Sequence, residues 1–231
     1  MRGLFGTAVL SAGLLLIGCE GSSDMAIPES APAMTPAPTP AEPAPPAAEQ
    51  APMTTTDASL LSEPNWAVLF SGHDLTAFNT IGGGNWQIVG GAVQADSGEP
   101  GFLVTKGAYT DFLIRAEFQA SPETNSGIFI RCQDPNAVDA EQCYEINIYD
   151  QNANPNNLTG AIVNLAPPAA SIMAGSEWNT FEIMAEGPHL TVRLNGTVTV
   201  DIEDAEHPAG YIALQYNTGL IRFRDVRLRP L

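Results

Sequence analysis

The chain has 231 residues, with 26 acidic side chains against nine basic ones and a net charge of −17 at pH 7. This excess of negative charge excludes the basic footprint of nucleic-acid-binding proteins and of proteins that adhere to anionic lipid head groups. It favours a soluble protein with neutral or cationic ligands.

The first 19 residues have the pattern of a secretory signal. Arg2 supplies a positive start, and the apolar run from Ala8 to Ile17 is about half the ~20 residues that a membrane-spanning helix needs. The ending Leu16-Ile17-Gly18-Cys19 resembles the lipobox of bacterial lipoproteins, which implies cleavage before Cys19 and its lipidation. The alternative is an ordinary secretory signal with a chance cysteine. We predict a signal peptide over residues 1–18 and an extracytoplasmic protein of the bacterial cell envelope, held at the membrane only through Cys19.

Residues 19–62 are rich in proline and alanine and contain no aromatic side chain. Such a segment cannot bury enough apolar surface to fold, so we predict a disordered, semi-rigid tether. Residues 63–231 are long enough to form one domain with a single hydrophobic core.

Two cysteines are left for the folded domain once Cys19 is lipidated. Cys132 and Cys143 flank a polar loop between two strand-like segments, and in an oxidising compartment they form a natural disulfide pair. Two unrelated buried thiols are the alternative.

The folded part consists of short apolar or alternating segments separated by turn residues. Gly90-Gly91 and Asn195-Gly196 indicate tight hairpins, and Gly82-Gly83-Gly84 is expected in a loop. No segment shows sustained helical periodicity, so the predicted fold is all-β, a two-sheet sandwich of the jelly-roll type. The expected strands cover residues 66–70, 86–89, 92–95, 112–120, 126–132, 144–149, 161–164, 178–185, 189–194, 197–202, 210–216 and 221–228.

Alternation along three of these strands predicts which side chains leave the core. If the strands are neighbours, one sheet face carries Arg131, Glu145, Asn147, Tyr149 and Gln215 together. A cation, a carboxylate, amides and an aromatic ring form a suitable set for gripping a sugar. The alternative is a solvated outer face with ordinary cross-strand pairs.

Other chemistries have weaker support in the sequence. The spacing from Glu145 to Asp150 resembles the Glu-x-Asp-x-x-Glu motif of sandwich-fold β-glucanases, but Asn147 replaces the central aspartate. The odd offset of five also places the two carboxylates on opposite faces, which disfavours a direct retaining glucanase. The histidines, His73, His189 and His207, are expected at the surface, and no zinc or phosphate-binding pattern is present.

Several segments follow one another in a characteristic order. They are Leu69–Leu75, Trp86–Val93, Phe102–Thr105, Tyr109–Phe112, Asn125–Arg131, Tyr144–Asp150, Glu177–Ile183, Gly210–Gln215 and Phe223–Val226. This series resembles the bacterial 3-keto-disaccharide hydrolase family over nearly the whole domain. The resemblance implies a concanavalin A-like jelly roll and a hydrolase or lyase activity on glycosides oxidised at C3, with carbohydrate as the partner.

A ketone at C3 acidifies the proton on C2, so such a glycoside is open to proton abstraction, elimination at C1 and hydration. These steps need a base near C2, a donor for the enolate oxygen and an acid for the leaving group. By residue type and face, Glu145 is the candidate base and Arg131 the candidate enolate stabiliser, while Asp150 is either the acid or one ligand of a divalent cation. No metal is identified. The expected sugar-binding residues are Asn125, Asn147, Tyr149, Trp178, Gln215 and Asn217.

One position departs from the family pattern. Many relatives continue after the Leu-Gln pair with Asp/Asn-His-Gly, whereas this chain has Tyr216-Asn217-Thr218-Gly219. Asparagine does not titrate near neutral pH, so an acid–base step that uses the family's histidine is lost at Asn217. A non-catalytic carbohydrate-binding or envelope-interaction module is therefore the alternative function.

Overall fold

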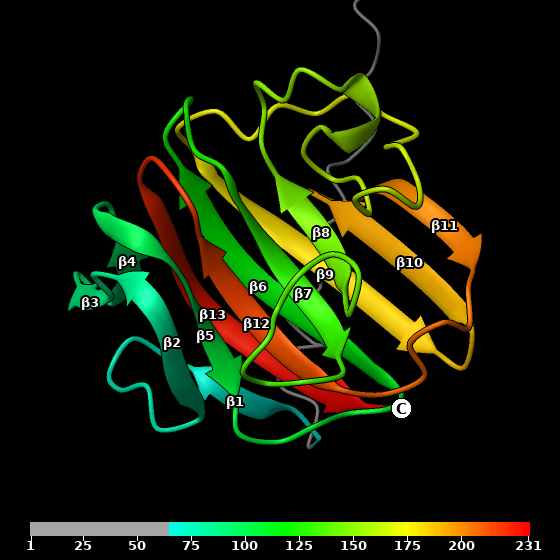
Figure 1. Cartoon of the computed structure of the whole chain (residues 1–231), viewed down its shortest axis with the longest axis horizontal. Coiled ribbons are helices and arrows are strands. Elements are labelled where there is room, and N and C mark those ends of the chain that lie inside the picture. Colours follow the sequence, from blue (N-terminus) through cyan, green and yellow to red (C-terminus); the bar gives the residue numbers. More distant parts are fainter. Residues whose placement is uncertain (1–64) are drawn as a thin grey trace, which may run out of the picture. The chain divides into compact units, whose positions relative to one another are not determined.

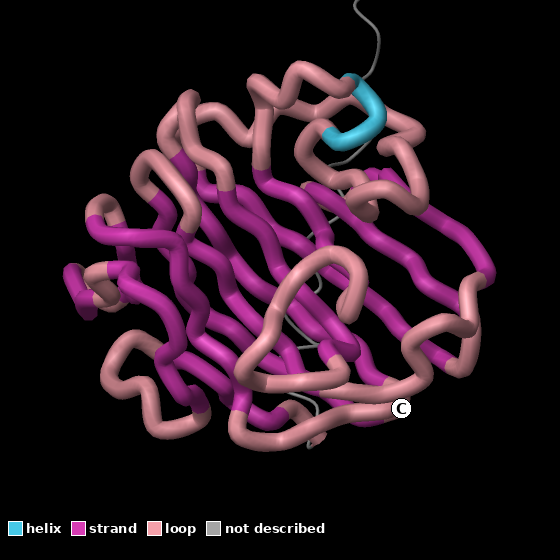
Figure 2. Tube along the Cα trace, in the orientation of Figure 1, coloured by secondary structure: helices cyan, strands magenta, loops and turns pink. Residues whose placement is uncertain are grey.

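The computed structural model describes residues 65–231, and the predicted signal peptide, Cys19 and the tether over 19–62 lie outside that range. Strands dominate the described part, and its one short helical turn is the 3-10 segment η2 (Pro155–Asn157) (Figure 2). None of the described segments forms a helix long and apolar enough to cross a membrane.

The larger of the two antiparallel sheets has eight strands and forms one layer of the sandwich (Figure 1). Its strand order is β11-β10-β9-β6-β13-β4-β3, and β1 also pairs with β13. The strands are β1 (Ala67–Phe70), β3 (Gln87–Val89), β4 (Ala92–Ala95), β6 (Phe112–Ala120), β9 (Trp178–Glu186), β10 (His189–Leu194), β11 (Thr197–Glu203) and β13 (Ile221–Pro230).

The smaller sheet has five strands in the order β2-β5-β12-β7-β8 and forms the other layer (Figure 1). Its strands are β2 (Phe78–Gly84), β5 (Gly98–Thr105), β7 (Ser126–Cys132), β8 (Tyr144–Ile148) and β12 (Tyr211–Tyr216). The predicted all-β, two-sheet jelly-roll sandwich is thus confirmed.

The main core fills the space between the inner faces of the two sheets. Alternate residues of β6 point into it, as the sequence pattern predicts, and Phe118 stacks on Phe181 of β9 with 4.9 Å between ring centroids. Ile128 and Ile146 meet them from the five-stranded sheet. Because inward and outward side chains alternate, the polar residues between these positions are presented on the outer faces.

Both predicted hairpins form. Val89 pairs with Ala92 across Gly90-Gly91, and Leu194 pairs with Thr197 across Asn195-Gly196. The two residues of each turn have positive φ, which is the conformation that a two-residue hairpin turn requires and that Gly and Asn tolerate.

The sequence predicts no strand at β2 or β5, and two other assignments made from it are wrong. Gly82-Gly83-Gly84 is not a loop but the end of β2, where a side chain on Gly82 would meet the carbonyl oxygen of Pro100 on β5 at 2.3 Å. Glycine is therefore needed for the close approach of two backbones. The segment 161–164 is not a strand, because only Ile162 makes isolated bridges, to Ile146 and Ala166.

Candidate functional site

The outer face of the five-stranded sheet brings Glu145, Asn147 and Gln215 together. On β7 and β8, Phe129 pairs with Glu145, and Gly127 pairs with Asn147. Leu214 of β12 pairs with Ile128, so Gln215 comes level with Gly127. Glu145, Asn147 and Gln215 therefore lie around Gly127 on one face of the sheet, as the sequence predicts for these three residues.

One end of this outer face is apolar. Phe129, Ala213 and Val104 are buried in a second cluster with the Cys132–Cys143 disulfide, and Val138 from the loop after β7 packs against it. The disulfide closes that loop and confirms the predicted cysteine pair. The loop thereby shields one end of the sheet, and the polar group around Glu145 lies beside this apolar end.

Glu145 lies over the backbone of β7, where no side chain competes with it. A Cβ at Gly127 would be 3.4 Å from Cγ of Glu145 and 3.5 Å from its Oε1, so a longer side chain there would displace the carboxyl group. Within residues 65–231, no hydrogen bond or ion pair to the Glu145 carboxyl group is found. A half-buried carboxyl without a protein partner is available to a ligand.

Burial raises the pKa of Glu145 to about 7. Desolvation disfavours the charged form, and no neighbouring cation offsets it. A carboxyl that titrates near neutral pH is a stronger base than an ordinary glutamate and still loses its proton readily. Glu145 is thus chemically suited to take a proton from a weakly acidic C–H bond.

Two amide oxygens beside Glu145 also lack partners. Asn147 is 2% exposed, and its Nδ2 donates to the backbone carbonyl of Asn157, which fixes the orientation of the amide. Its Oδ1 and the Oε1 of Gln215 are buried without a hydrogen-bond partner. Such unsatisfied acceptors are rare in native proteins and set this part of the sheet apart from an ordinary packed surface.

Three other predicted sugar-binding residues lie at the same end of the five-stranded sheet. The amides of Asn217 and Thr218 both donate to the carbonyl of Asn125, at 3.2 and 3.1 Å, so the chain bulges where β12 ends. Tyr149 directly follows β8, and its amide donates to Thr159 Oγ1 at 2.9 Å. Asn125, Asn217 and Tyr149 are all half-buried, and their side chains make no hydrogen bonds with the rest of the described chain.

The expectation that Arg131 shares this face is wrong. Arg131 has φ 54° and sits where the pairing of β7 with β12 slips by a residue, so its side chain turns off the outer face and is fully buried. Its guanidinium donates to the carbonyls of Thr110 and Gly187 at 2.7 Å and to Asp111 Oδ1 at 3.1 Å. A β-bulge reverses the in–out alternation from which Arg131 was expected on the outer face. The guanidinium group instead binds the loops that contain Thr110 and Gly187.

Both carboxylate oxygens of Asp150 are also hydrogen-bonded within the protein. Its Oδ1 accepts hydrogen bonds from Thr159 Oγ1 at 2.5 Å and from the amide of Ala174 at 3.0 Å, and its Oδ2 accepts one from the amide of Gly175 at 2.9 Å. These bonds tie the long connection between β8 and β9 to the end of β8. The geometry gives Asp150 an anchoring role and does not favour the acid or metal-ligand role expected from the sequence.

Trp178 lies on the other sheet and cannot contact a sugar at Glu145. It begins β9, and its ring packs under the guanidinium groups of Arg224, 3.9 Å from the centroid, and Arg222, 5.3 Å away. Sequence alternation places a residue on one of two faces but does not say which sheet its strand joins. The predicted stacking role of Trp178 is therefore incompatible with its position.

The histidines do not form a metal centre with other ligands. His73 is exposed, and His189 pairs with Asp201 at 2.7 Å. His207 is 6% exposed and packs against Tyr144, so its predicted surface position is wrong. In the described range, no three side chains among His, Cys, Asp and Glu gather as metal ligands.

Two features of the site escaped sequence reasoning. The first is Gly127, whose missing side chain leaves room for Glu145. The second is the segment from Gly160 to Val163, which runs along the free edge of β8, where the amide of Val163 donates to the carbonyl of Glu145 at 2.9 Å. A glycine inside a strand was the one available signal for the first. For the second, the sequence predicts an extended segment at 161–164 but not that it lies along β8.

A model of the 3-keto-alpha-glucoside-1,2-lyase-like domain matches residues 65–229, which is nearly all of the described part of the chain. No curated protein matches the sequence.

Three solved structures that share the fold are named as glycosyl hydrolases or as a carbohydrate-binding module. Two candidate glycosyl hydrolases from Parabacteroides distasonis match with TM-scores of 0.65 and 0.60 at 17% and 25% identity; both matches cover 72% of this chain, and they cover 94% and 99% of the hydrolases. The carbohydrate-binding module CBM66 from Bacillus subtilis matches with a TM-score of 0.52 at 15% identity over 67% of this chain and 96% of its own. The likenesses at 15% and 17% identity show the shared fold alone.

Proposed function

Because this chain belongs to the 3-keto-alpha-glucoside-1,2-lyase-like family, we propose that it cleaves glycosides oxidised at C3 on the outer face of its five-stranded sheet. The observation that carries the proposal is the half-buried, unpartnered carboxyl group of Glu145 beside the unpartnered amide oxygens of Asn147 and Gln215. Family membership supplies the substrate class, and these side chains supply the chemistry.

Glu145 takes the C2 proton, and the electron pair of the C2–H bond moves toward the C3 ketone to give an enolate. Collapse of the enolate breaks the C1–O bond, and the leaving alcohol receives a proton. Water then adds to C1 of the resulting enone while C2 regains a proton, so the net reaction is a hydrolysis. Stopping before the addition of water makes the same enzyme a lyase.

Gln215 orients the oxidised ring in this scheme, because its side chain is half-buried. Asn147 is 2% exposed and supports the site through its hydrogen bond to the carbonyl of Asn157. The amide nitrogen of Gln215 has no hydrogen-bond partner within residues 65–231 and is the donor we assign to the enolate oxygen, in place of Arg131. Charge then develops in a half-buried setting where a hydrogen bond has more effect than in water.

Replacing the carboxyl group tests this function directly. Glu145→Gln keeps the shape of the side chain and removes the base, so turnover of a 3-keto-glucoside is expected to fall at least about 100-fold. Glu203→Gln changes an exposed carboxylate at the end of β11 and is the matched control. Full activity in the Glu145 variant, with an unchanged melting temperature, excludes Glu145 from the mechanism.

A glycan-binding module without turnover is the second candidate function. Asn217 favours it, because it stands where the family resemblance expects a titratable histidine. This alternative predicts that oligosaccharide raises the melting temperature of the protein while a 3-keto-disaccharide yields neither an absorbing enone nor a released reducing sugar.

We also propose that the protein works outside the cytoplasm, attached through a lipid on Cys19. The Cys132–Cys143 disulfide supports an oxidising compartment. The attachment predicts that Cys19→Ala moves the full chain from the membrane fraction to the soluble fraction; an unchanged distribution would contradict it.

A further inference from the structure

A pocket of about 290 Å³ lies at the side of β8, outside the group around Glu145. Four asparagines line it, together with Leu165, which is 41% exposed. We call it the amide pocket and define it by Asn154, Asn156, Asn157, Asn164 and Leu165. None of the described residues that line it carries a charge.

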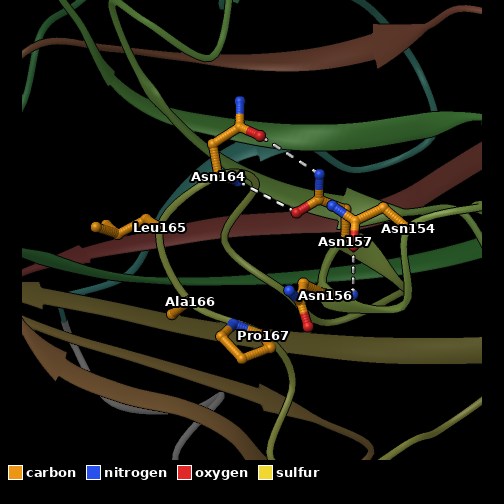
Figure 3. A pocket seen from close by; sticks show the side chains of 7 residues that line it. All are labelled: Asn154, Asn156, Asn157, Asn164, Leu165, Ala166 and Pro167. Atoms are coloured by element: carbon orange, nitrogen blue, oxygen red, sulfur yellow. Dashed lines mark hydrogen bonds between the residues drawn. The ribbon is translucent and has the colours of Figure 1, made fainter.

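The asparagines are partly held in place by one another (Figure 3). Asn157 and Asn164 face each other: the backbone amide of Asn164 donates to Asn157 Oδ1 at 3.2 Å, and Asn157 Nδ2 lies 3.5 Å from Asn164 Oδ1. Asn154 Oδ1 accepts from the amide of Asn156 at 3.1 Å. The side-chain amide of Asn156 makes no hydrogen bond within residues 65–231, so its donors and acceptor are available to a ligand.

Short backbone connections join the amide pocket to the site around Glu145. The carbonyl of Asn157 accepts from Asn147 Nδ2, so one residue of the pocket fixes one amide of the site. Val163, which precedes Asn164, donates its amide to the carbonyl of Glu145 at 2.9 Å.

The chemistry of the pocket selects a neutral, hydroxyl-rich ligand. A side-chain amide both donates and accepts hydrogen bonds, as a sugar hydroxyl does, and the exposed Leu165 offers apolar surface to the C–H face of a ring. Without a charged lining, the pocket has no means of pairing with an ion, and the net charge of −17 repels anions. Its volume lies just under the roughly 300–1,000 Å³ of pockets for drug-sized ligands and suits a single ring.

We propose that the amide pocket is a second carbohydrate-binding site, which takes an unoxidised, neutral sugar unit. The position of that unit relative to the reacting ring rests on the function proposed above: the oxidised ring lies at Glu145, and a further unit of the same glycan occupies the pocket.

Binding and turnover test these two statements separately. Binding of an unoxidised neutral glucose disaccharide to the full chain is measured by NMR titration for the wild type, Asn156→Ala and Gln151→Ala. Gln151 is the matched control, an exposed amide of the same connection that does not line the pocket. Loss of one or two hydrogen bonds is expected to weaken binding to Asn156→Ala about five- to tenfold, with Gln151→Ala unchanged.

Turnover of a 3-keto-disaccharide is then compared with turnover of a methyl 3-keto-glucoside, which has no second sugar unit. Asn156→Ala is expected to raise KM about five- to tenfold for the disaccharide alone. Equal binding of the disaccharide by all three proteins, or none by the wild type, overturns the pocket proposal. Retained binding with no turnover of either substrate instead supports the pocket and overturns the proposed function. Equal melting temperatures of the variants establish that each is folded.

Discussion

The outer faces of the two sheets are built from similar residues but treat their polar groups differently. On the eight-stranded sheet, most polar groups contact one another: Arg224 Nε lies 2.6 Å from Glu117 Oε2, and Arg222 Nη1 donates to Gln119 at 2.9 Å, although Nε of Arg115 and Nε of Arg222 are buried without a partner among the described residues. On the five-stranded sheet, Glu145 and two amide oxygens are left without partners.

The carboxyl groups differ most clearly between the two faces. Paired exposed charges contribute modestly to stability. Glu145, by contrast, is a desolvated carboxyl without a partner, and perturbed carboxyls of this kind are enriched at functional sites.

Arg131→Ala has the largest expected effect, and that effect is on stability. The change removes the buried partner of Asp111 and leaves the carbonyls of Thr110 and Gly187 unsatisfied. The free energy of unfolding is expected to fall by about 3–5 kcal/mol, measured by denaturant titration. Arg193→Ala, which removes an exposed arginine of β10, is the control and should change it by less than about 0.5 kcal/mol. A stable and fully active Arg131→Ala protein would refute the anchoring role.

Asp150→Asn should cost on the order of 2 kcal/mol. The amide keeps one acceptor oxygen and places an NH2 group where the other was, so it cannot accept all three hydrogen bonds from Thr159, Ala174 and Gly175. Faster hydrogen exchange at the amides of Ala174 and Gly175 is the local measurement. If exchange there is unchanged while activity vanishes, Asp150 belongs to the chemistry after all.

The pH dependence of stability sharpens the comparison at Glu145. Its pKa is about 7 in the folded protein against 4.5 for an ordinary glutamate, so the folded state retains a proton that the unfolded chain has already lost. Stability linked to this group is therefore fully present below about pH 4.5 and is lost as the pH rises to about 7, by up to the order of 2 kcal/mol.

The measurement is the free energy of unfolding of the wild type and of Glu145→Gln between pH 4.5 and 8. The wild type should lose stability relative to the variant across this range. A difference that does not vary with pH would mean that Glu145 is not desolvated.

Trp178→Ala has the smallest expected effect. The indole contacts Arg222 and Arg224 on the eight-stranded sheet, and each exposed cation–π contact contributes about 0.5–1 kcal/mol. Stability should fall slightly and turnover of a 3-keto-glucoside should be unaffected. A large rise in KM would mean that the substrate binds on the eight-stranded sheet and not at Glu145.

The sequence predicts the fold better than the site. Alternation and the turns at Gly90-Gly91 and Asn195-Gly196 are local signals, and they identify most of the strands and both hairpins. Glu145, Asn147 and Gln215 were placed correctly on one face because β7, β8 and β12 are neighbours and regular at those positions.

The failures concern information that is not local. Arg131 lies in a bulge, whose one trace in the sequence is Gly210, where a side chain would collide with the Cys132 carbonyl at 2.3 Å. Trp178 is on a regular strand, but its sheet is decided by pairing with β6 and β10. Asp150 is tied by residues up to 25 positions away, and no spacing rule reveals such a contact.

The fate of the hydrogen on C2 shows whether the reaction begins with proton abstraction. Turnover of a 3-keto-disaccharide by the full chain in deuterated water is followed by NMR, with an enzyme-free sample as the control for spontaneous exchange. If Glu145 removes the C2 proton, the released oxidised sugar carries deuterium at C2, and Glu145→Gln forms no such product. Cleavage that retains the original hydrogen at C2 would contradict the account.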